Sequence, residues 1–380
     1  FFSYLCKYIP NIKYMLTKFK INKFRGFNKE LEWDLSHPSN YEYNNFAVRN
    51  GIIKNGIIYG PNGSGKSNLS MALFDIINHL SQKFKQADYY RNFIHAGSPN
   101  QLVDFEYTFQ FDNLHLVYAY SKTREGRLIN ESLMVDGNRV FDKQSNKLYL
   151  DSRSFALNDD TLNALATNSN NISIAYYLLS TYPLEASHYL IKLRDFVEGM
   201  LWFVNLDERK FMGLKSAVQN VDEYIIRQKL VTDFEAFLYD ISGQRYAFLP
   251  PQKGEKLLYC SFGKHAAPFQ EIASTGTRSL ELLYFWVQQL REASFVFIDE
   301  FDAFYHFDLS KKVCQRLFQF DCQVFTSTHN TSLMSNDLLR PDCYFLLDNN
   351  QIKPLNCCTH KELREAHNLE KMYRGGALEV

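Results

Sequence analysis

Alternating apolar and polar residues mark two stretches of the chain as half-buried β-strands. The first runs from Leu16 to Phe27, and Leu31 to Leu35 is its expected hairpin partner. The second runs from Asp104 to Phe141 and carries turn signals at Asp112-Asn113 and Asp136-Gly137. These patterns predict an antiparallel sheet whose second part is a meander of strands.

Apolar runs predict a further set of strands, of which "SFVFIDE" is expected to be buried. One run ends at Tyr59, and the others are "SFVFIDE", "CQVFTSTHN" and "CYFLLDNNQIKPL". A helix is expected from about Lys66 to Lys83, and "STGTRSLELLYFWVQQL" opens a second helix after a strand in "EKLLYCSF". Buried strands that alternate with helices predict an α/β fold.

Longer helical periods fill the middle of the chain, from about Asp151 to Gln252. No heptad repeat persists there, which argues against a long coiled coil and favours a helical insertion. We therefore predict an N-terminal lobe at 15–150, a helical insertion at 151–252 and a C-terminal lobe at 253–380. We expect Phe1 to Tyr14 to be an upstream extension without a function.

The tail "KELREAHNLEKMY" predicts an amphipathic helix. Its apolar positions, at roughly helical spacing, are Leu363, Ala366, Leu369 and Tyr373. Packing of this face on the protein's own sheet is the favoured interpretation, and binding of a partner is the alternative.

The turn "GPNGSGKS" stands between a strand and a helix and matches the phosphate-binding pattern GxxxxGK[ST], the P-loop or Walker A motif. Glycines let backbone N–H groups turn inward around phosphate oxygens, and the helix N-terminus favours negative charge. Lys66 would reach the β- and γ-phosphates, and Ser67 would bind Mg²⁺. The predicted nucleotide-binding residues are Gly60, Pro61, Asn62, Gly63, Ser64, Gly65, Lys66 and Ser67.

The run "FVFIDE", Phe295 to Glu300, is an apolar strand that ends in two carboxylates, as a Walker B motif does. Adjacent acids at a strand end can divide their roles, so that Asp299 holds Mg²⁺ and Glu300 polarises the attacking water. A strand that ends in Asp-Glu is by itself most often a solvated terminus. Downstream of a P-loop it indicates an ATP hydrolase.

Two further features bear on the site. His329 ends the apolar strand in "VFTSTHN", where an imidazole can contact the γ-phosphate, although a lone histidine is usually structural. In "ASTGTRSLELL", Ser274 and Gly276 can present a hydroxyl and an N–H group to phosphate at a helix N-terminus. An ordinary helix cap by Ser274 explains that turn equally well.

Composition limits the class of protein. Lys and Arg together number 42, as do Asp and Glu, so the formal net charge is zero and no strongly basic field indicates nucleic acid, although a local patch stays open. The seven cysteines are scattered without a CxxC pair, which favours a reduced, cytoplasmic protein. No apolar run reaches the length of about 18 residues that a membrane helix requires, so no membrane is expected.

The order of these motifs resembles that of the ABC-type ATPases, with "ASTGT" in place of their LSGGQ signature. "IDEFDAFYH" resembles the DEPExxLHP turn of the overcoming-lysogenization-defect (OLD) ATPases, with His306 at the histidine. "KFKINKFRGF" is similar to the strand that opens SMC-like and OLD-like heads. More closely, the chain looks like stand-alone OLD-like ATPases without a Toprim nuclease, such as the ATPase subunits of the antiphage systems PARIS and Septu.

The resemblance implies an ABC-ATPase-like head, in which a P-loop core sheet and an antiparallel β meander carry a helical insertion. It implies ATP and Mg²⁺ as cofactors. It also implies that Ser274 and Gly276 cap the γ-phosphate bound to a neighbouring chain, with Asp302 at the seam. The expected partners are therefore a second copy of the chain and a separately encoded effector such as a nuclease.

Two other functions remain as alternatives. A DNA-binding repair or maintenance clamp of the SMC kind would require long coiled coils, which the insertion does not provide, and the net charge does not support it. A transporter motor would require a Q-loop glutamine, for which Gln101 is only a weak candidate. The leading hypothesis is an ATPase switch that gates an effector, with a role in antiphage defence implied by the resemblance alone.

Overall fold

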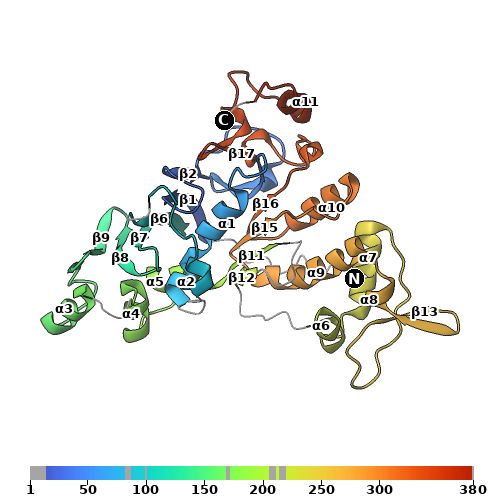
Figure 1. The fold of residues 1–380 in the computed structure, drawn as a ribbon, viewed down its shortest axis with the longest axis horizontal. Coiled ribbons are helices and arrows are strands. Elements are labelled where there is room, and N and C mark those ends of the chain that lie inside the picture. The colour runs from blue at the N-terminus through green and yellow to red at the C-terminus, as the bar shows by residue number, and fades with distance from the viewer. Residues whose placement is uncertain are drawn as a thin grey trace.

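The computed structural model describes residues 14–81, 87–98, 101–167, 172–204, 211–213 and 220–378. Two seven-stranded sheets form its centre, the antiparallel one at the left of Figure 1 and the largely parallel one nearer the middle. This arrangement confirms the predicted α/β fold with an antiparallel meander. Residues 1–13 of the expected N-terminal extension lie outside the described residues, whereas Tyr14 already belongs to the first strand.

The antiparallel sheet contains the predicted meander. Its strands, in order across the sheet, are β10 (Lys147–Leu150), β9 (Asn138–Gln144), β8 (Leu128–Val135), β7 (Leu114–Lys122), β6 (Val103–Phe111), β1 (Tyr14–Asn22) and β2 (Leu31–Asp34). The first strand is shorter than predicted, because Lys23 and Arg25 adopt left-handed φ angles of 60° and 47° that end it. The turns at Asp112 and Asp136 lie where the sequence predicts them.

The second sheet is parallel at its centre. Its strands, in order, are β12 (Phe211–Gly213), β11 (Met200–Val204), β15 (Phe295–Asp299), β16 (Gln323–Ser327), β5 (Asn55–Tyr59), β17 (Tyr344–Asp348) and β18 (Gln351–Pro354). The five from β11 to β17 run parallel, and the two edge strands are antiparallel to their neighbours. Every residue of β5, β15 and β16 is buried, which explains why these strands read as continuous apolar runs.

The predicted helical insertion contains helices, but also β11 and β12, two strands of the largely parallel sheet. Its helices are α3 (Asp159–Thr167), α4 (Ile174–Thr181), α5 (Tyr189–Glu198), α6 (Val221–Arg227) and α7 (Val231–Ser242). The helical period read through "GMLWFV" is wrong, since α5 ends at Glu198 and β11 then pairs with β15. A Cβ atom at Gly199 would lie 3.0 Å from the backbone nitrogen of Ser294, so a side chain there would require the neighbouring backbone to shift. The parallel sheet thus takes strands from all three predicted segments, whose boundaries stay a prediction.

The helix predicted from Lys66 to Lys83 is broken in two. Helix α1 (Lys66–Leu73) and helix α2 (Asp75–Ser81) meet at Phe74. The hydroxyl of Tyr107 donates to the carbonyl oxygens of Ala72 and Leu73 at 3.2 and 3.1 Å, and thereby competes for the carbonyls that a continuous helix uses. The predicted residues at 82 and 83 lie outside the described residues.

The tail helix is also shorter than predicted, since α11 spans only Leu369–Arg374. The side-chain amide of Asn336 donates to the carbonyl oxygens of Arg364, Glu365 and His367 at 2.9–3.2 Å, which holds that stretch as a turn. Leu363 and Leu369 are buried but Ala366 is exposed, so the predicted apolar face does not form. The buried leucines favour packing on the protein itself.

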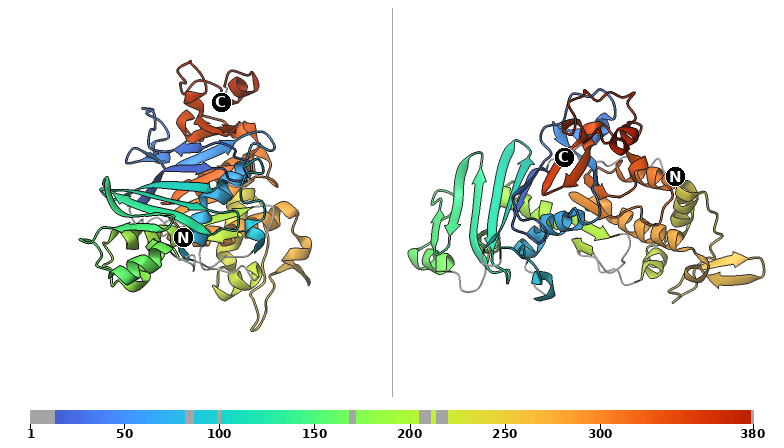
Figure 2. Two further views of the ribbon diagram at one scale, coloured as in Figure 1. Left: turned by 60° about the vertical axis from the view of Figure 1, so that its left-hand side comes forward. Right: turned by 45° about the horizontal axis from the view of Figure 1, so that its top comes forward.

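The remaining helices flank the parallel sheet or extend from it. Helix α8 (Phe269–Ile272) precedes α9 (Thr275–Gln289), and α10 (Phe307–Leu317) follows β15 (Figure 1). The strand predicted in "EKLLYCSF" is β13 (Tyr259–Phe262), which pairs with β14 (His265–Pro268) in a hairpin and also forms an isolated bridge with Phe248. This hairpin projects from the body of the molecule (Figure 2).

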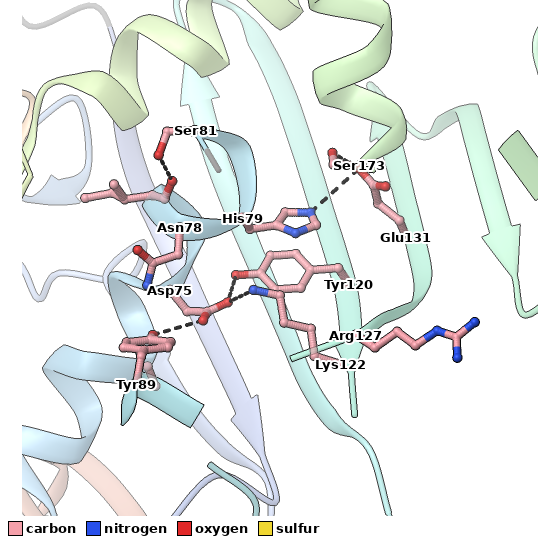
Figure 3. Close-up of polar contacts among 12 residues, drawn as sticks. Asp75, Asn78, His79, Ser81, Tyr89, Tyr120, Lys122, Arg127, Glu131 and Ser173 are labelled. Carbon is pink, nitrogen blue, oxygen red and sulfur yellow. Dashed lines mark hydrogen bonds and ion pairs between the residues drawn. The ribbon is translucent and has the colours of Figure 1, made fainter. Parts of the chain in front are cut away.

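A buried polar network joins α2 to the antiparallel sheet (Figure 3). Asp75, at the start of α2, accepts hydrogen bonds from the hydroxyls of Tyr89 and Tyr120 at 2.9 and 2.8 Å and from the ammonium of Lys122 at 2.5 Å. Both Asp75 and Lys122 are buried. The network therefore attaches the helix pair that begins at the P-loop to strand β7.

A second buried carboxylate links α2 to α4. Glu131 on β8 accepts hydrogen bonds from the Ser173 hydroxyl at 2.7 Å and from the N–H groups of Ile174 and Ala175, the first residues of α4. The imidazole of His79 lies 3.7 Å from the same carboxylate, and burial lowers the pKa of His79. A carboxylate at a helix N-terminus is stabilising, so Glu131 fixes where α4 begins.

Removing the cation of the Asp75 pair is expected to destabilise the protein. Lys122→Met leaves a buried carboxylate without its counter-charge, which typically costs about 3–5 kcal/mol. The free energy of unfolding in urea, followed by circular dichroism, measures this loss. Lys147→Met, at an exposed position of the same sheet, is the matched control and is expected to unfold like the wild type. Equal stability of Lys122→Met and the wild type would contradict the importance of the pair.

Candidate nucleotide-binding site

The P-loop connects β5 to α1 through a turn that only glycine accommodates at two positions. Gly65 has a φ of 105°, and a Cβ atom there would lie 2.8 Å from the ring of Phe27. At Gly60 a Cβ atom would approach the carbonyl oxygen of Leu347 to 2.4 Å. Because α1 begins at Lys66, its unsatisfied N–H groups lie at this turn, as an anion site requires.

The surroundings of Lys66 and Ser64 indicate whether the turn fits a phosphate. The Lys66 side chain is buried, and its Nζ donates to the carbonyl oxygens of Gly60 and Pro61 at 2.8 and 3.4 Å. Burial lowers the pKa of Lys66, whereas Asp299 and Glu300 raise it. The Ser64 hydroxyl is buried and has no hydrogen-bond partner among the described residues. A buried ammonium and a partnerless hydroxyl, next to the exposed Ser67, fit the oxygens of a phosphate chain.

The two carboxylates of the "FVFIDE" motif lie at the carboxyl end of β15. Asp299 is buried, and its Oδ1 atom accepts a hydrogen bond from the Ser327 hydroxyl. Glu300 is half-buried and has a left-handed φ of 49°. Because β15, β16 and β5 are parallel neighbours, the residues that follow these strands meet at one edge of the sheet.

His329 belongs to the same cluster. It follows β16 and is exposed. Burial of part of the ring and the positive charge of Lys66 lower the pKa of His329, against the opposing effect of Glu300. A lowered pKa favours the neutral imidazole, whose N–H group can donate a hydrogen bond to a phosphate oxygen.

Ser274 and Gly276 are not part of this cluster. Figure 1 draws the start of α9 beside α7 and α8 and apart from α1. The Ser274 hydroxyl accepts a hydrogen bond from the Thr277 N–H at 3.2 Å, which is the ordinary cap that the sequence left open. Ser274 is also exposed, so it can cap its own helix and still be accessible to a second molecule. A Cβ atom at Gly276 would lie 3.1 Å from the carbonyl oxygen of Phe304, in the acidic turn.

The remaining residues considered from the sequence are Asp302, His306 and Gln101. Asp302 accepts a hydrogen bond from the Thr328 hydroxyl at 2.6 Å, and burial raises the pKa of Asp302. His306 caps α10, where its Nδ1 atom accepts from the Leu309 N–H at 3.4 Å. Gln101 is exposed in the loop before β6.

Sequence reasoning missed a basic pocket beside the P-loop. Its volume is about 350 Å³, and the lining side chains include Arg25, Asn68, His95 and Arg124. The Nε atom of Arg25 is buried without a hydrogen-bond partner among the described residues, and burial lowers the pKa of this arginine. Asn68 lies in the first turn of α1, so the pocket adjoins the loop itself. The only signal in the sequence was the motif "KFRGF", which resembled the opening strand of related heads.

The sequence matches the RecF/RecN/SMC N terminal domain family over residues 15–340, which is most of the chain. The protein belongs to this family. It is therefore an ABC-type ATPase of the SMC and RecF kind, for which binding of a nucleotide with Mg²⁺ is general. The more specific resemblance to OLD-like, PARIS or Septu ATPases stays a prediction.

Solved structures with a similar fold include SMC heads and RecF. An SMC head bound to the C-winged helix domain of ScpA has a TM-score of 0.46 and 17% identity, over 89% of this chain and 97% of that chain. The SMC head domain from Thermotoga maritima has a TM-score of 0.43 and 16% identity, over 89% and 98%. RecF with ATP has a TM-score of 0.39 and 13% identity, over 90% and 99%. Among curated proteins, none matches the chain.

Within the described part of this RecF/RecN/SMC-family protein, no helix has both the length and the apolar character needed to cross a membrane.

Proposed function

We propose that two copies of this RecF/RecN/SMC-family protein bind ATP between them and that hydrolysis of the ATP switches their assembly. The observation that carries the proposal is the cluster at the carboxyl edge of the parallel sheet. There Lys66 follows β5, Asp299 and Glu300 lie at the end of β15, and His329 follows β16, three neighbouring parallel strands. The charges of Asp299 and Glu300 also raise the pKa of Lys66. One buried cation, two carboxylates and a neutral imidazole beside a P-loop are what hydrolysis of a nucleotide requires.

Each side chain then has a defined task. The loop Gly60–Ser67 binds the phosphate chain through its N–H groups and Lys66. Ser67 and Asp299 would hold Mg²⁺, which when bound neutralises charge on the phosphate oxygens. Glu300 orients the attacking water and accepts its proton, and His329 donates a hydrogen bond to the γ-phosphate.

The argument for the dimer starts from Ser274, which is exposed, and Gly276, which is half-buried, at the start of α9. A single chain does not bring these residues to its own P-loop, whereas a second copy related by a two-fold axis can present them to the γ-phosphate. The start of α9 then adds a hydroxyl and N–H groups to the bound anion.

Ser274→Asp tests the contact without removing the helix cap. Aspartate is as good a cap as serine, so α9 stays intact, but its charge repels a γ-phosphate of the second copy. ATP hydrolysis is expected to fall by roughly 10²-fold or more, as after loss of one donor at a developing charge. Ser274→Asn is the matched control, because it also caps the helix but is neutral, and it is expected to retain more activity. Full activity of Ser274→Asp would mean that Ser274 is a cap alone.

Mixing two inactive variants tests the dimer directly. In a heterodimer of Ser274→Asp and Lys66→Ala, one site combines an intact P-loop with an intact Ser274. A random mixture is therefore expected to recover roughly a quarter of the wild-type activity. No recovery, with heterodimers demonstrated by co-purification of the two variants through different affinity tags, would overturn the shared site.

The proposed partner is a separately encoded effector, such as a nuclease, that is gated by the nucleotide state. The support is the resemblance of "STGTRSL" and "FIDEFDAFYH" to stand-alone ATPases of antiphage systems. Co-purification of the product of a neighbouring gene in ATP, and its release after hydrolysis, is the test of this role.

The family match favours a second candidate, a DNA-binding repair or maintenance ATPase. Binding to duplex DNA that weakens linearly with the logarithm of salt concentration would support it. Absence of binding at low salt, with and without ATP, would exclude it.

A further inference from the structure

Two hydroxyl groups at the end of β16 bond the acidic turn that follows β15. The Ser327 hydroxyl donates to the Oδ1 atom of Asp299 and accepts from the N–H group of Glu300 at 3.0 Å. The Thr328 hydroxyl donates to Asp302 at 2.6 Å. Ser327 and Thr328 are only 0% and 1% exposed, so water does not compete for these bonds.

The backbone of the same two residues joins the turn to the P-loop strand. The carbonyl oxygen of Ser327 accepts from the Phe301 N–H at 3.3 Å, and the Thr328 N–H donates to the carbonyl oxygen of Ile58 at 3.2 Å. The end of β16 thus lies between the acidic turn on one side and the strand that leads to the P-loop on the other.

Glu300 depends on this support because its backbone is strained. A φ of 49° is left-handed, a conformation that costs a residue with a side chain about 1–2 kcal/mol. The bond from its N–H group to Ser327 offsets that cost and fixes the direction in which the side chain leaves the turn. The bond to Asp299 engages Oδ1, so Oδ2 is the oxygen without a protein donor among the described residues.

We propose that Ser327 is the positioning residue for both acids of the site, and that it sets the orientation of Asp299 and Glu300 through one hydroxyl. The inference rests on the proposed function, since it assumes that these acids bind Mg²⁺ and orient water. It assigns a role to Ser327, which lies in the run "VFTSTHN" but was not among the predicted site residues. Thr328 supports Asp302 in the same way.

The strand supplies its own matched control. Thr326 lies one residue earlier on β16 and is buried, but its hydroxyl has no hydrogen-bond partner among the described residues. Thr326→Val removes a buried hydroxyl at nearly constant volume and leaves the acidic turn untouched. Ser327→Ala removes a hydroxyl that makes two bonds to that turn.

The experiment compares Ser327→Ala, Thr326→Val and the wild type in three measurements. For Ser327→Ala, kcat for ATP hydrolysis is expected to fall roughly 10- to 100-fold, as after misplacement of a catalytic group, while the affinity for ATP without metal stays the same. Titration with Mn²⁺ in the presence of a non-hydrolysable ATP analogue, followed by electron paramagnetic resonance, is expected to show weaker metal binding. Hydrogen exchange of the Glu300 amide is expected to accelerate in the nucleotide-free protein. Thr326→Val is expected to match the wild type in all three.

Several outcomes would overturn the proposal. One is unchanged exchange at Glu300 together with unchanged kcat in Ser327→Ala. Another is an equal loss in Thr326→Val, which would mean that any change in β16 disturbs the site. Ser327→Cys keeps a weaker donor and acceptor and is expected to lie between the wild type and Ser327→Ala, so it decides the matter if the alanine variant does not fold. A wild-type protein without ATPase activity would refute the proposed function, whereas exchange at Glu300 would still decide whether Ser327 holds the turn.

Discussion

Glu300→Gln is expected to abolish ATP turnover and to leave ATP binding intact. Glutamine has nearly the same shape as glutamate but cannot accept the proton of the attacking water, a role that typically contributes about 10²–10⁴-fold to the rate. Lys66, Asp299 and the loop glycines are unchanged, so the phosphates stay bound. Phosphate release measures the loss of turnover, and titration with a fluorescent ATP analogue measures binding.

The same variant is expected to accumulate as an ATP-bound dimer. Hydrolysis is the step that separates the two copies in the proposed cycle, so its loss prolongs their association. Light scattering with and without Mg-ATP reports the mass of each species. Glu292→Gln is the matched control, because this exposed glutamate lies just before β15, at the opposite end of the strand. Unchanged hydrolysis in Glu300→Gln would refute Glu300 as the base.

Lys66→Ala is expected to weaken ATP binding and ATP-dependent assembly together. The ammonium is buried and bonds the loop carbonyls of Gly60 and Pro61, from where it would also bond phosphate oxygens. A hydrogen bond to a charged group contributes about 1.5–3 kcal/mol, so the affinity is expected to fall roughly 10- to 100-fold. Isothermal titration calorimetry measures the affinity, and light scattering measures assembly.

Lys312→Ala, at an exposed position of α10, is the control for loss of a positive charge. If Lys66→Ala loses ATP binding but still assembles like the wild type, surfaces other than the nucleotide site hold the oligomer. Such a result would leave the P-loop assignment in place and refute assembly through ATP.

Local patterns predicted the elements whose residues carry their own signal. The P-loop was readable because glycine at positions such as Gly65 is required by a turn that lies within eight consecutive residues. The meander was readable because half-buried strands alternate, and "FVFIDE" was readable because a strand buried on both faces is continuously apolar. These signals depend only on neighbours along the chain.

The errors arose where a distant residue decides the local structure. Tyr107 from the antiparallel sheet breaks the helix at Phe74, and Asn336 holds 364–367 as a turn instead of a helix. The apolar run "MLWFV" has no property that separates a buried helix from a buried strand, and pairing with β15 makes it a strand. In each case a tertiary contact outweighs a weak local preference.

The sequence by itself identified which residues carry the chemistry, because a nucleotide site demands particular side chains at short, fixed spacings. Only the folded chain brings Lys66, Asp299 and His329 to one place, through the order of β15, β16 and β5 across the sheet. The folded chain also decided that the Ser327 hydroxyl bonds the carboxylate of Asp299 and the N–H group of Glu300. These bonds depend on the register between β15 and β16, in which Ser327 lies beside a residue 28 positions earlier in the chain. Strand order and register are set by long-range packing, and no local pattern records them.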